Sequence, residues 1–137
     1  MQIKQTTFAK ISEKVEEMLN EDMFVKTGKK LGNPEKLAFS IEEEGKFIAG
    51  ITGTLSIESF HINTLAVAAE YQGKDYGTKL VKAIEEEAFS RGAKVFTVST
   101  QDYQALEFYQ KLGYEVFGTL ENSPFANATK YYLKKNT

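Results

Sequence analysis

Residues 65–79 read LAVAAEYQGKDYGTK. The stretch leaves an apolar strand, crosses a turn that contains Gly73 and Gly77, and enters the start of a helix. The first N–H groups of a helix have no partners within it, and the helix dipole adds positive potential there. The pattern predicts a binding site for an anionic group such as a phosphate, although an ordinary strand-to-helix turn has the same features.

The segments around this turn predict a parallel pair of strands. Residues 60–67 and 94–100 are rich in apolar and β-branched side chains, and a helix at 77–91 connects them. That helix has an apolar face and is followed by Gly92, a residue type common just beyond helix ends. The strand–helix–strand order implies a crossover connection and therefore a parallel pair.

The rest of the chain adds strands and helices to the same sheet. Residues 37–41 and 46–57 predict a hairpin around Gly45, and Gly50 and Gly53 predict a bulge or a close backbone approach. We also expect four further elements and one loop: a helix through Ile11, Val15, Met18 and Leu19, a loop at 22–36, a short helix at 105–112, and strands at 114–120 and 128–135. The predicted fold class is α/β, a mixed sheet of about seven strands with flanking helices. One of these strands precedes the first helix, and residues 1–137 form a single domain.

The composition excludes several kinds of functional site and binding partner. The chain has 137 residues, 42% of them hydrophobic and 26% charged, with a net charge of −2. These values are ordinary for a globular protein. It has no cysteine, which excludes a disulfide framework, a thiolate zinc site and a cysteine nucleophile, and we expect no metal site. The small net charge predicts no binding to nucleic acid or to an anionic membrane. The first residues do not resemble a signal peptide and no apolar run is long enough to span a bilayer, so we expect a cytoplasmic location.

Two motifs occur in the order of a known family. Val67, four residues, and QGKDYG at 72–77 resemble a Gln/Arg-x-x-Gly-x-Gly/Ala loop, and ALEFYQKLGY at 105–114 resembles an Ala-x-x-Phe-Tyr-x-Lys-x-Gly-Phe/Tyr segment. Both patterns are those of the GNAT N-acetyltransferases. The order of elements is similar to the GNAT fold across nearly the whole chain.

Two positions depart from the family pattern. Asp75 stands where the family usually has glycine, and Asp102 replaces a frequent asparagine. Aspartate tolerates a left-handed backbone better than most residues. Its charge beside a pyrophosphate is nevertheless unfavourable unless the side chain points away or pairs with Lys74 or Lys79.

The resemblance implies the GNAT acyl-CoA N-acyltransferase fold, with acetyl-CoA as cosubstrate. Acetyl-CoA would lie where the strands at 60–67 and 94–100 splay apart, along the backbone of Leu65 and Val67. An amine would attack the thioester directly, without a covalent enzyme intermediate. The turn that would hold the pyrophosphate consists of Gln72, Gly73, Lys74, Asp75, Tyr76, Gly77 and Thr78.

Two residues are candidates for proton transfer. Tyr109 matches a tyrosine that many family members place beside the sulfur, where it would donate a proton to the leaving thiolate. The alternative is a core aromatic on a short amphipathic helix. His61 is the only histidine and lies where histone-acetylating members carry a catalytic glutamate, so it would take the proton of the amine. On a regular strand it shares a face with Leu65 and Val67. The alternative is a structural histidine, with proton transfer through water.

Other functions and partners stay open. A non-catalytic acyl-CoA-binding sensor or partner module of the same fold is one alternative, favoured by Asp75 and Asp102. An unrelated nucleotide-binding domain is another, although neither of its glycine-rich phosphate loops is present. The acceptor amine is not specified: small molecules, peptide N-termini and lysine side chains all fit, with residues 22–36 and 121–128 on the expected acceptor side. A homodimer formed through an exposed late strand is also open.

Overall fold

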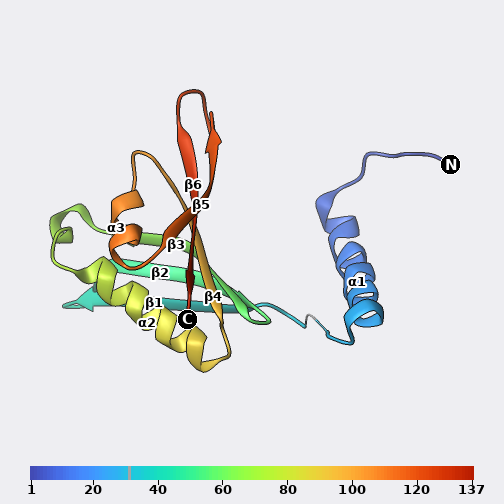
Figure 1. Ribbon diagram of the computed structural model, residues 1–137, viewed down its shortest axis with the longest axis horizontal. Coiled ribbons are helices and arrows are strands. Elements are labelled where there is room, and N and C mark those ends of the chain that lie inside the picture. The colour runs from blue at the N-terminus through green and yellow to red at the C-terminus, as the bar shows by residue number, and fades with distance from the viewer. Residues whose placement is uncertain (31) are drawn as a thin grey trace. The chain divides into compact units, whose positions relative to one another are not determined.

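The computed structural model describes residues 1–30 and 32–137 and divides the chain into two compact units, Met1–Asn33 and Pro34–Thr137 (Figure 1). The first unit contains one helix, α1 (Phe8–Thr27), none of whose residues is buried. Thr7 caps its start by accepting a hydrogen bond from the Lys10 amide. Gly28 ends it in a left-handed conformation, which glycine adopts at little cost.

The loop predicted at residues 22–36 is wrong at both ends, because α1 continues through Thr27 and β1 already begins at Glu35. Asp22 and Lys26 form an i,i+4 ion pair at 3.1 Å, and no glycine or proline interrupts the helix before Gly28. The prediction also included Leu31, which lies outside the described residues.

The second unit contains a six-stranded sheet in the order β1-β2-β3-β4-β6-β5. Among the strands that the structure describes, only β3 and β4 pair in parallel, which confirms the predicted crossover around α2. The strands are β1 (Glu35–Glu43), β2 (Lys46–Ser56), β3 (Ser59–Val67), β4 (Val95–Gln101), β5 (Glu115–Glu121) and β6 (Thr129–Asn136). The helices are α2 (Tyr76–Ser90) and the short α3 (Leu106–Lys111), with a 3-10 turn, η1 (Ala69–Tyr71), before α2.

The sheet has six strands rather than about seven, because no strand precedes α1. Residues 1–7 lie in the first unit, where the described residues include only a helix. A strand needs a neighbouring strand to pair its backbone groups, and this unit offers none. The mixed α/β fold class is otherwise confirmed.

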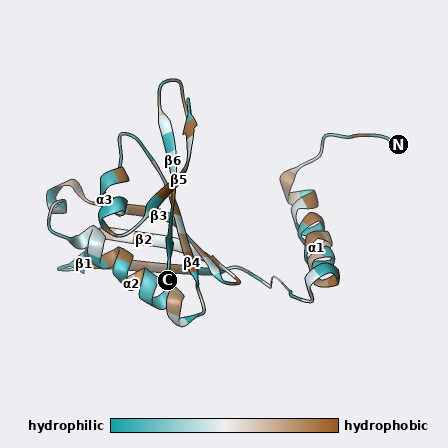
Figure 2. Cartoon of the chain, viewed as in Figure 1, coloured by the Kyte–Doolittle hydropathy of each residue, from teal (hydrophilic) through white to brown (hydrophobic). Residues whose placement is uncertain are grey.

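The hydrophobic core lies between α2 and one face of the sheet. α2 packs against β1, β2 and β3, and brown and teal segments alternate along its ribbon (Figure 2). The Phe60 and Phe96 rings meet edge to face at 6.1 Å, which joins the two parallel strands. The helix residues that are buried in this core are Leu80, Val81, Ile84 and Ala88. Each large apolar side chain buried here contributes about 1.5–3 kcal/mol.

Gly53 lies at both of the features that the sequence predicted as alternatives, a close approach and a bulge. A Cβ atom at this position would lie 2.1 Å from the Phe60 ring, so no other residue fits without moving the core. The pairing of β2 with β3 also shifts register between Thr52 and Gly53, which is a bulge. None of the described helices is both long and apolar enough to cross a membrane.

Candidate active site

The parallel strands β3 and β4 separate after three paired positions. They pair at Ser59 with Val95, at Phe60 with Phe96 and at His61 with Thr97, and then diverge. A cleft of about 510 Å³ lies between them, and Tyr109 of α3 reaches it. The predicted splay is confirmed. Its strand residues are Ile62, Asn63, Thr64, Leu65, Ala66 and Val67 of β3 and Val98, Ser99 and Thr100 of β4.

A second hollow of about 400 Å³ lies at the start of α2 and shares Leu65, Val67 and Gln72 with the cleft. Lys74 is the one residue of the predicted cosubstrate set that does not line it. The predicted residues that do line it are Leu65, Val67, Gln72, Gly73, Asp75, Tyr76, Gly77 and Thr78. The structure therefore brings the end of β3 and the glycine turn together in one continuous site.

The backbone of this turn has the form expected for an anion site. Gly73 and Asp75 both have left-handed conformations, with φ of 80° and 66°. The Gln72 side chain donates a hydrogen bond to the Val67 carbonyl at 3.0 Å, which holds the turn against the end of β3. The first helical bond runs from the Lys79 amide to the Asp75 carbonyl. The amides at the very start of α2 therefore have no acceptor within the helix.

Gly77 lies where α2 approaches α3. A Cβ atom at Gly77 would lie 3.2 Å from the Phe108 ring, and Val67 is also close. A larger residue would push α3 away from the hollow or occupy the hollow itself. The absence of a side chain at Gly77 thus serves helix packing as well as ligand approach.

The charged and aromatic side chains around the hollow are engaged with one another. The Tyr76 hydroxyl donates a hydrogen bond of 2.8 Å to Glu43, so the start of α2 is attached to the end of β1. This bond raises the pKa of Tyr76. Lys74 lies over the Tyr71 ring at 5.3 Å, and Lys79 lies over Tyr76 at 5.7 Å.

The sequence left open whether the Asp75 carboxylate pairs with Lys74 or Lys79. Among the described residues, its side chain forms neither an ion pair with Lys74 or Lys79 nor a hydrogen bond that caps α2. Sequence reasoning missed Glu43, because a contact across 33 residues depends on the tertiary fold.

Tyr109 is both a core residue and a lining residue of the cleft. Its side chain is 4% exposed, and its ring packs edge-on against Phe108 at 5.1 Å and Tyr114 at 5.6 Å. Burial raises the pKa of Tyr109 to about 12. Its hydroxyl therefore stays protonated at neutral pH and is a permanent hydrogen-bond donor.

The bulge in β3 changes which residues face the core. Asn63 and Thr64 follow one another, yet both bond to side chains on the outer face of β2, Asn63 to Thr54 and Thr64 to Thr52. Two successive residues on the same side reverse the alternation of a strand. The residues of β3 that pack in or against the core are Phe60, Ile62, Leu65 and Val67.

The prediction that His61 shares a face with Leu65 and Val67 is therefore wrong, because the bulge lies between them. His61 lies on the outer face, opposite to these two residues. Its Nδ1 is 2.8 Å from the Thr97 hydroxyl. Burial, and then the charge of Lys130, lower the pKa of His61 below its ordinary 6.5, so the ring is neutral at pH 7.

The Asp102 carboxylate has a structural partner. Its oxygen accepts a hydrogen bond of 3.3 Å from the Thr129 amide, and its own amide donates to the Thr129 carbonyl at 2.9 Å. These bonds attach the end of β4 to the start of β6. The aspartate at this position therefore takes part in a local hydrogen-bond pair.

Comparison with known proteins identifies the family. The model of the Acetyltransferase (GNAT) family matches residues 4–114. A blasticidin-S acetyltransferase from Streptomyces morookaense is 29% identical over 87 residues, which span 63% of this chain and 64% of that protein. The chain thus matches less than two thirds of that relative's length.

Solved structures share the fold. An acetyltransferase from Bacillus cereus ATCC 14579 is 25% identical, with a TM-score of 0.88 over 100% of this chain and 98% of that chain. An aminoglycoside 6′-N-acetyltransferase in complex with coenzyme A is 20% identical, with a TM-score of 0.67 over 89% and 90% of the two chains. The splayed strands, the glycine turn and the family match lead to one conclusion: this chain belongs to the GNAT acetyltransferase family.

Proposed function

We propose that this protein is an N-acetyltransferase that transfers the acetyl group of acetyl-CoA directly to an amine of a small molecule or peptide. The observation that carries the proposal is the continuity of two hollows, one at the start of α2 and one between β3 and β4. The first offers helix N–H groups for a pyrophosphate. The second offers the backbone edge that β3 no longer shares with β4.

The parts of acetyl-CoA match the parts of this site. The pyrophosphate would be bound by the turn from Gln72 to Thr78, and the pantetheine arm would pair with the backbone of Leu65 and Val67 as an added strand does. This orientation leads the thioester into the cleft that Tyr109 lines. The match to an acetyltransferase family supports acetyl-CoA as the cosubstrate.

The reaction needs three kinds of assistance. The amine nitrogen bonds to the carbonyl carbon, and a backbone N–H of β3 stabilises the oxyanion. The C–S bond then breaks, and the Tyr109 hydroxyl donates a hydrogen bond to the developing thiolate. A pKa of about 12 at Tyr109 exceeds that of a thiol, about 8.5. Complete transfer from Tyr109 is therefore uphill, and the proton that the amine releases finally neutralises the sulfur.

His61 is the proposed acceptor of that amine proton through an intervening water, because it lines neither the cleft nor the hollow at α2. Its lowered pKa keeps the ring neutral and able to accept. The hydrogen bond with Thr97 occupies Nδ1. The base role requires the tautomer in which Nδ1–H donates to Thr97, because Nε2 then carries the free lone pair.

An acceptor screen tests the proposal. Purified protein is incubated with acetyl-CoA and a panel of amines, and release of free thiol is measured. The similarity to a blasticidin-S and an aminoglycoside acetyltransferase makes antibiotic amines the first group to test, followed by peptide N-termini and lysine side chains. Binding of acetyl-CoA without transfer to any amine would instead favour the sensor or partner module.

We further propose that residues 1–137 act as a single GNAT domain. The family match over residues 4–114 supports this, because it includes α1 as well as most of the second unit. We also propose that the protein is cytoplasmic. A homodimer formed through an exposed late strand is the oligomeric state to test.

A further inference from the structure

A shielded polar cluster lies beside Tyr109, and none of its residues lines the cleft. The Tyr114 hydroxyl donates a hydrogen bond of 2.7 Å to one carboxylate oxygen of Glu85. Lys135 Nζ lies 3.2 and 3.3 Å from the two oxygens of the same carboxylate and 5.6 Å from the centre of the Tyr114 ring. Tyr114 is 2% exposed and the Glu85 side chain 13% exposed. The cluster thus joins α2, β6 and the segment after α3.

Tyr114 is also in direct contact with Tyr109. The two rings meet edge to face at 5.6 Å, with an angle of 73° between their planes. The Tyr114 amide donates a hydrogen bond of 3.1 Å to the Tyr109 carbonyl, and the Leu112 amide donates to the same oxygen at 3.0 Å. α3 has only six residues, so its own hydrogen bonds hold Tyr109 weakly. The placement of Tyr109 therefore depends on Tyr114.

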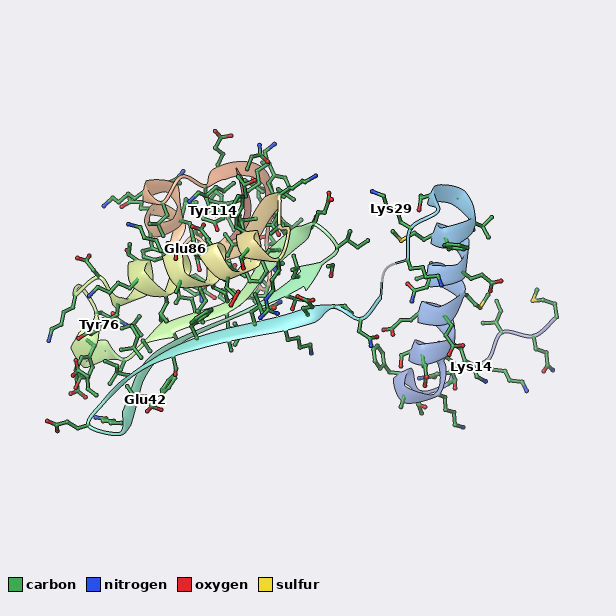
Figure 3. The ribbon with its side chains drawn as sticks, turned by 90° about the horizontal axis from the view of Figure 1, so that it is seen from below. Lys14, Lys29, Glu42, Tyr76, Glu86 and Tyr114 are labelled. Carbon is green, nitrogen blue, oxygen red and sulfur yellow. The ribbon has the colours of Figure 1, made fainter. Side chains whose placement is uncertain are left out.

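Packing alone does not require the polar groups of this cluster. A phenylalanine ring would fill the volume of Tyr114, and burying a carboxylate and a hydroxyl costs free energy that apolar side chains avoid. What the hydrogen bond adds is a fixed position for the Tyr114 ring, because the Glu85 carboxylate is itself held by Lys135. Tyr114 lies beside α2 in Figure 3.

We infer that Tyr114, Glu85 and Lys135 form a positioning cluster that holds the Tyr109 hydroxyl at the reacting sulfur. None of the three lines the cleft or the hollow at α2, so they act through Tyr109 and do not touch the substrate. The inference rests on the proposed role of Tyr109.

A double-mutant cycle tests the inference. Turnover with acetyl-CoA and a responsive amine is measured for wild type, Tyr109→Phe, Tyr114→Phe and the double variant. Tyr114→Phe is expected to lower kcat between about threefold and a hundredfold, the range of coupling between contacting residues, with the KM for acetyl-CoA unchanged. On the Tyr109→Phe background the same change is expected to alter kcat by less than about twofold, because its target is already absent.

Two further comparisons separate positioning from stability. Tyr132→Phe removes a hydroxyl from a half-buried β6 tyrosine that packs against Phe117, outside the cluster, and is expected to leave kcat unchanged. Glu85→Gln keeps an acceptor for the Tyr114 hydroxyl and is expected to retain most of the turnover. Glu85→Leu removes the acceptor and is expected to behave like Tyr114→Phe. It also replaces that variant in the cycle should Tyr114→Phe fail to fold.

The outcomes distinguish the inference from the proposed function. Equal losses from Tyr114→Phe on both backgrounds would overturn the positioning role while leaving Tyr109 as the donor. Full turnover by Tyr109→Phe would overturn both the role of Tyr109 and this inference. If acetyl-CoA binds but none of the amines in the panel causes thiol release, the result would count against the proposed function itself.

Discussion

Asp75 has a backbone conformation that favours glycine and a charge that opposes a phosphate. Its φ of 66° and ψ of 13° are left-handed, which costs a non-glycine residue about 1–2 kcal/mol, and aspartate somewhat less. Asp75 is one of the residues that line the hollow at the start of α2. A like charge at a few ångströms in a hydrated site costs about 1 kcal/mol.

We therefore expect Asp75→Gly to bind CoA about fivefold more tightly and to unfold at a higher temperature. Asp75→Asn is the matched control, because it removes the charge while keeping a residue that tolerates the left-handed region. Titration calorimetry and thermal unfolding separate the two effects. Weaker binding by both variants would show that the carboxylate assists the ligand rather than repelling it.

The proposed role of His61 as the base predicts how turnover depends on pH. A protonated imidazole cannot accept the proton of the amine, so activity is expected to fall as the pH drops through the pKa of His61. Because burial and Lys130 lower that pKa below 6.5, the fall lies below pH 6.5. No alkaline decline from Tyr109 is expected below about pH 11, since its pKa is raised to about 12.

His61→Ala is expected to lower turnover by roughly a hundredfold or more and to remove the acidic decline. His61→Gln serves as control, since it preserves a hydrogen-bonding partner for Thr97 but cannot act as a base near pH 7. A variant with alanine that keeps both the wild-type rate and the wild-type pH profile would exclude His61 and leave water as the acceptor.

At the scale of elements, the approach of α2 to α3 depends on Gly77. A Cβ atom there lies 3.2 Å from the Phe108 ring, so alanine needs a small shift and valine a larger one. Gly77→Val is expected to reduce CoA affinity at least tenfold while the domain stays folded, because the β-branched side chain enters the hollow. Glu86→Val, which places the same side chain at an exposed position of α2 outside both hollows, is the control. Unchanged calorimetric affinity in a folded Gly77→Val protein would contradict the assigned binding turn.

Most elements of the second unit were predictable because their patterns are local. The apolar side chains of α2 recur with the period of a helix. Gly92 follows the end of α2 and Gly113 the end of α3, both in left-handed conformations. The hairpin β1–β2 turns at Glu44 and Gly45, both with positive φ. The glycine turn was predictable for the same reason, since a strand, a glycine and a helix start are adjacent in sequence.

The errors arise where a non-local or irregular feature decides. The side of the sheet that His61 faces depends on the bulge at Asn63 and Thr64. A signal was present: these two polar residues interrupt the alternation of apolar side chains, which passes from even positions to odd ones. The bond of Tyr76 to Glu43 and the Tyr114 cluster had no such signal, because each joins segments that are distant in sequence.

At the scale of the whole molecule, the proposal of a single domain predicts that the whole chain unfolds in one cooperative transition. α1 has 20 residues, against 15 in α2 and 6 in α3, so it supplies about half of the helical circular dichroism. All seven tyrosines lie in the second unit, so tyrosine fluorescence reports that unit alone. A helix that buries none of its side chains is marginal in water and needs support from packing outside itself.

We expect the circular dichroism at 222 nm and the tyrosine fluorescence to change together in a single denaturant transition, as one domain requires. An early loss of about half the helical signal, with unchanged fluorescence, would show that α1 unfolds independently and that the chain is not one cooperative unit. Repeating the titration over a hundredfold range of protein concentration adds a second test. A midpoint that rises with concentration would show that association stabilises the fold, as a homodimer would. A constant midpoint would instead mean that the folded chain is stable without a second copy.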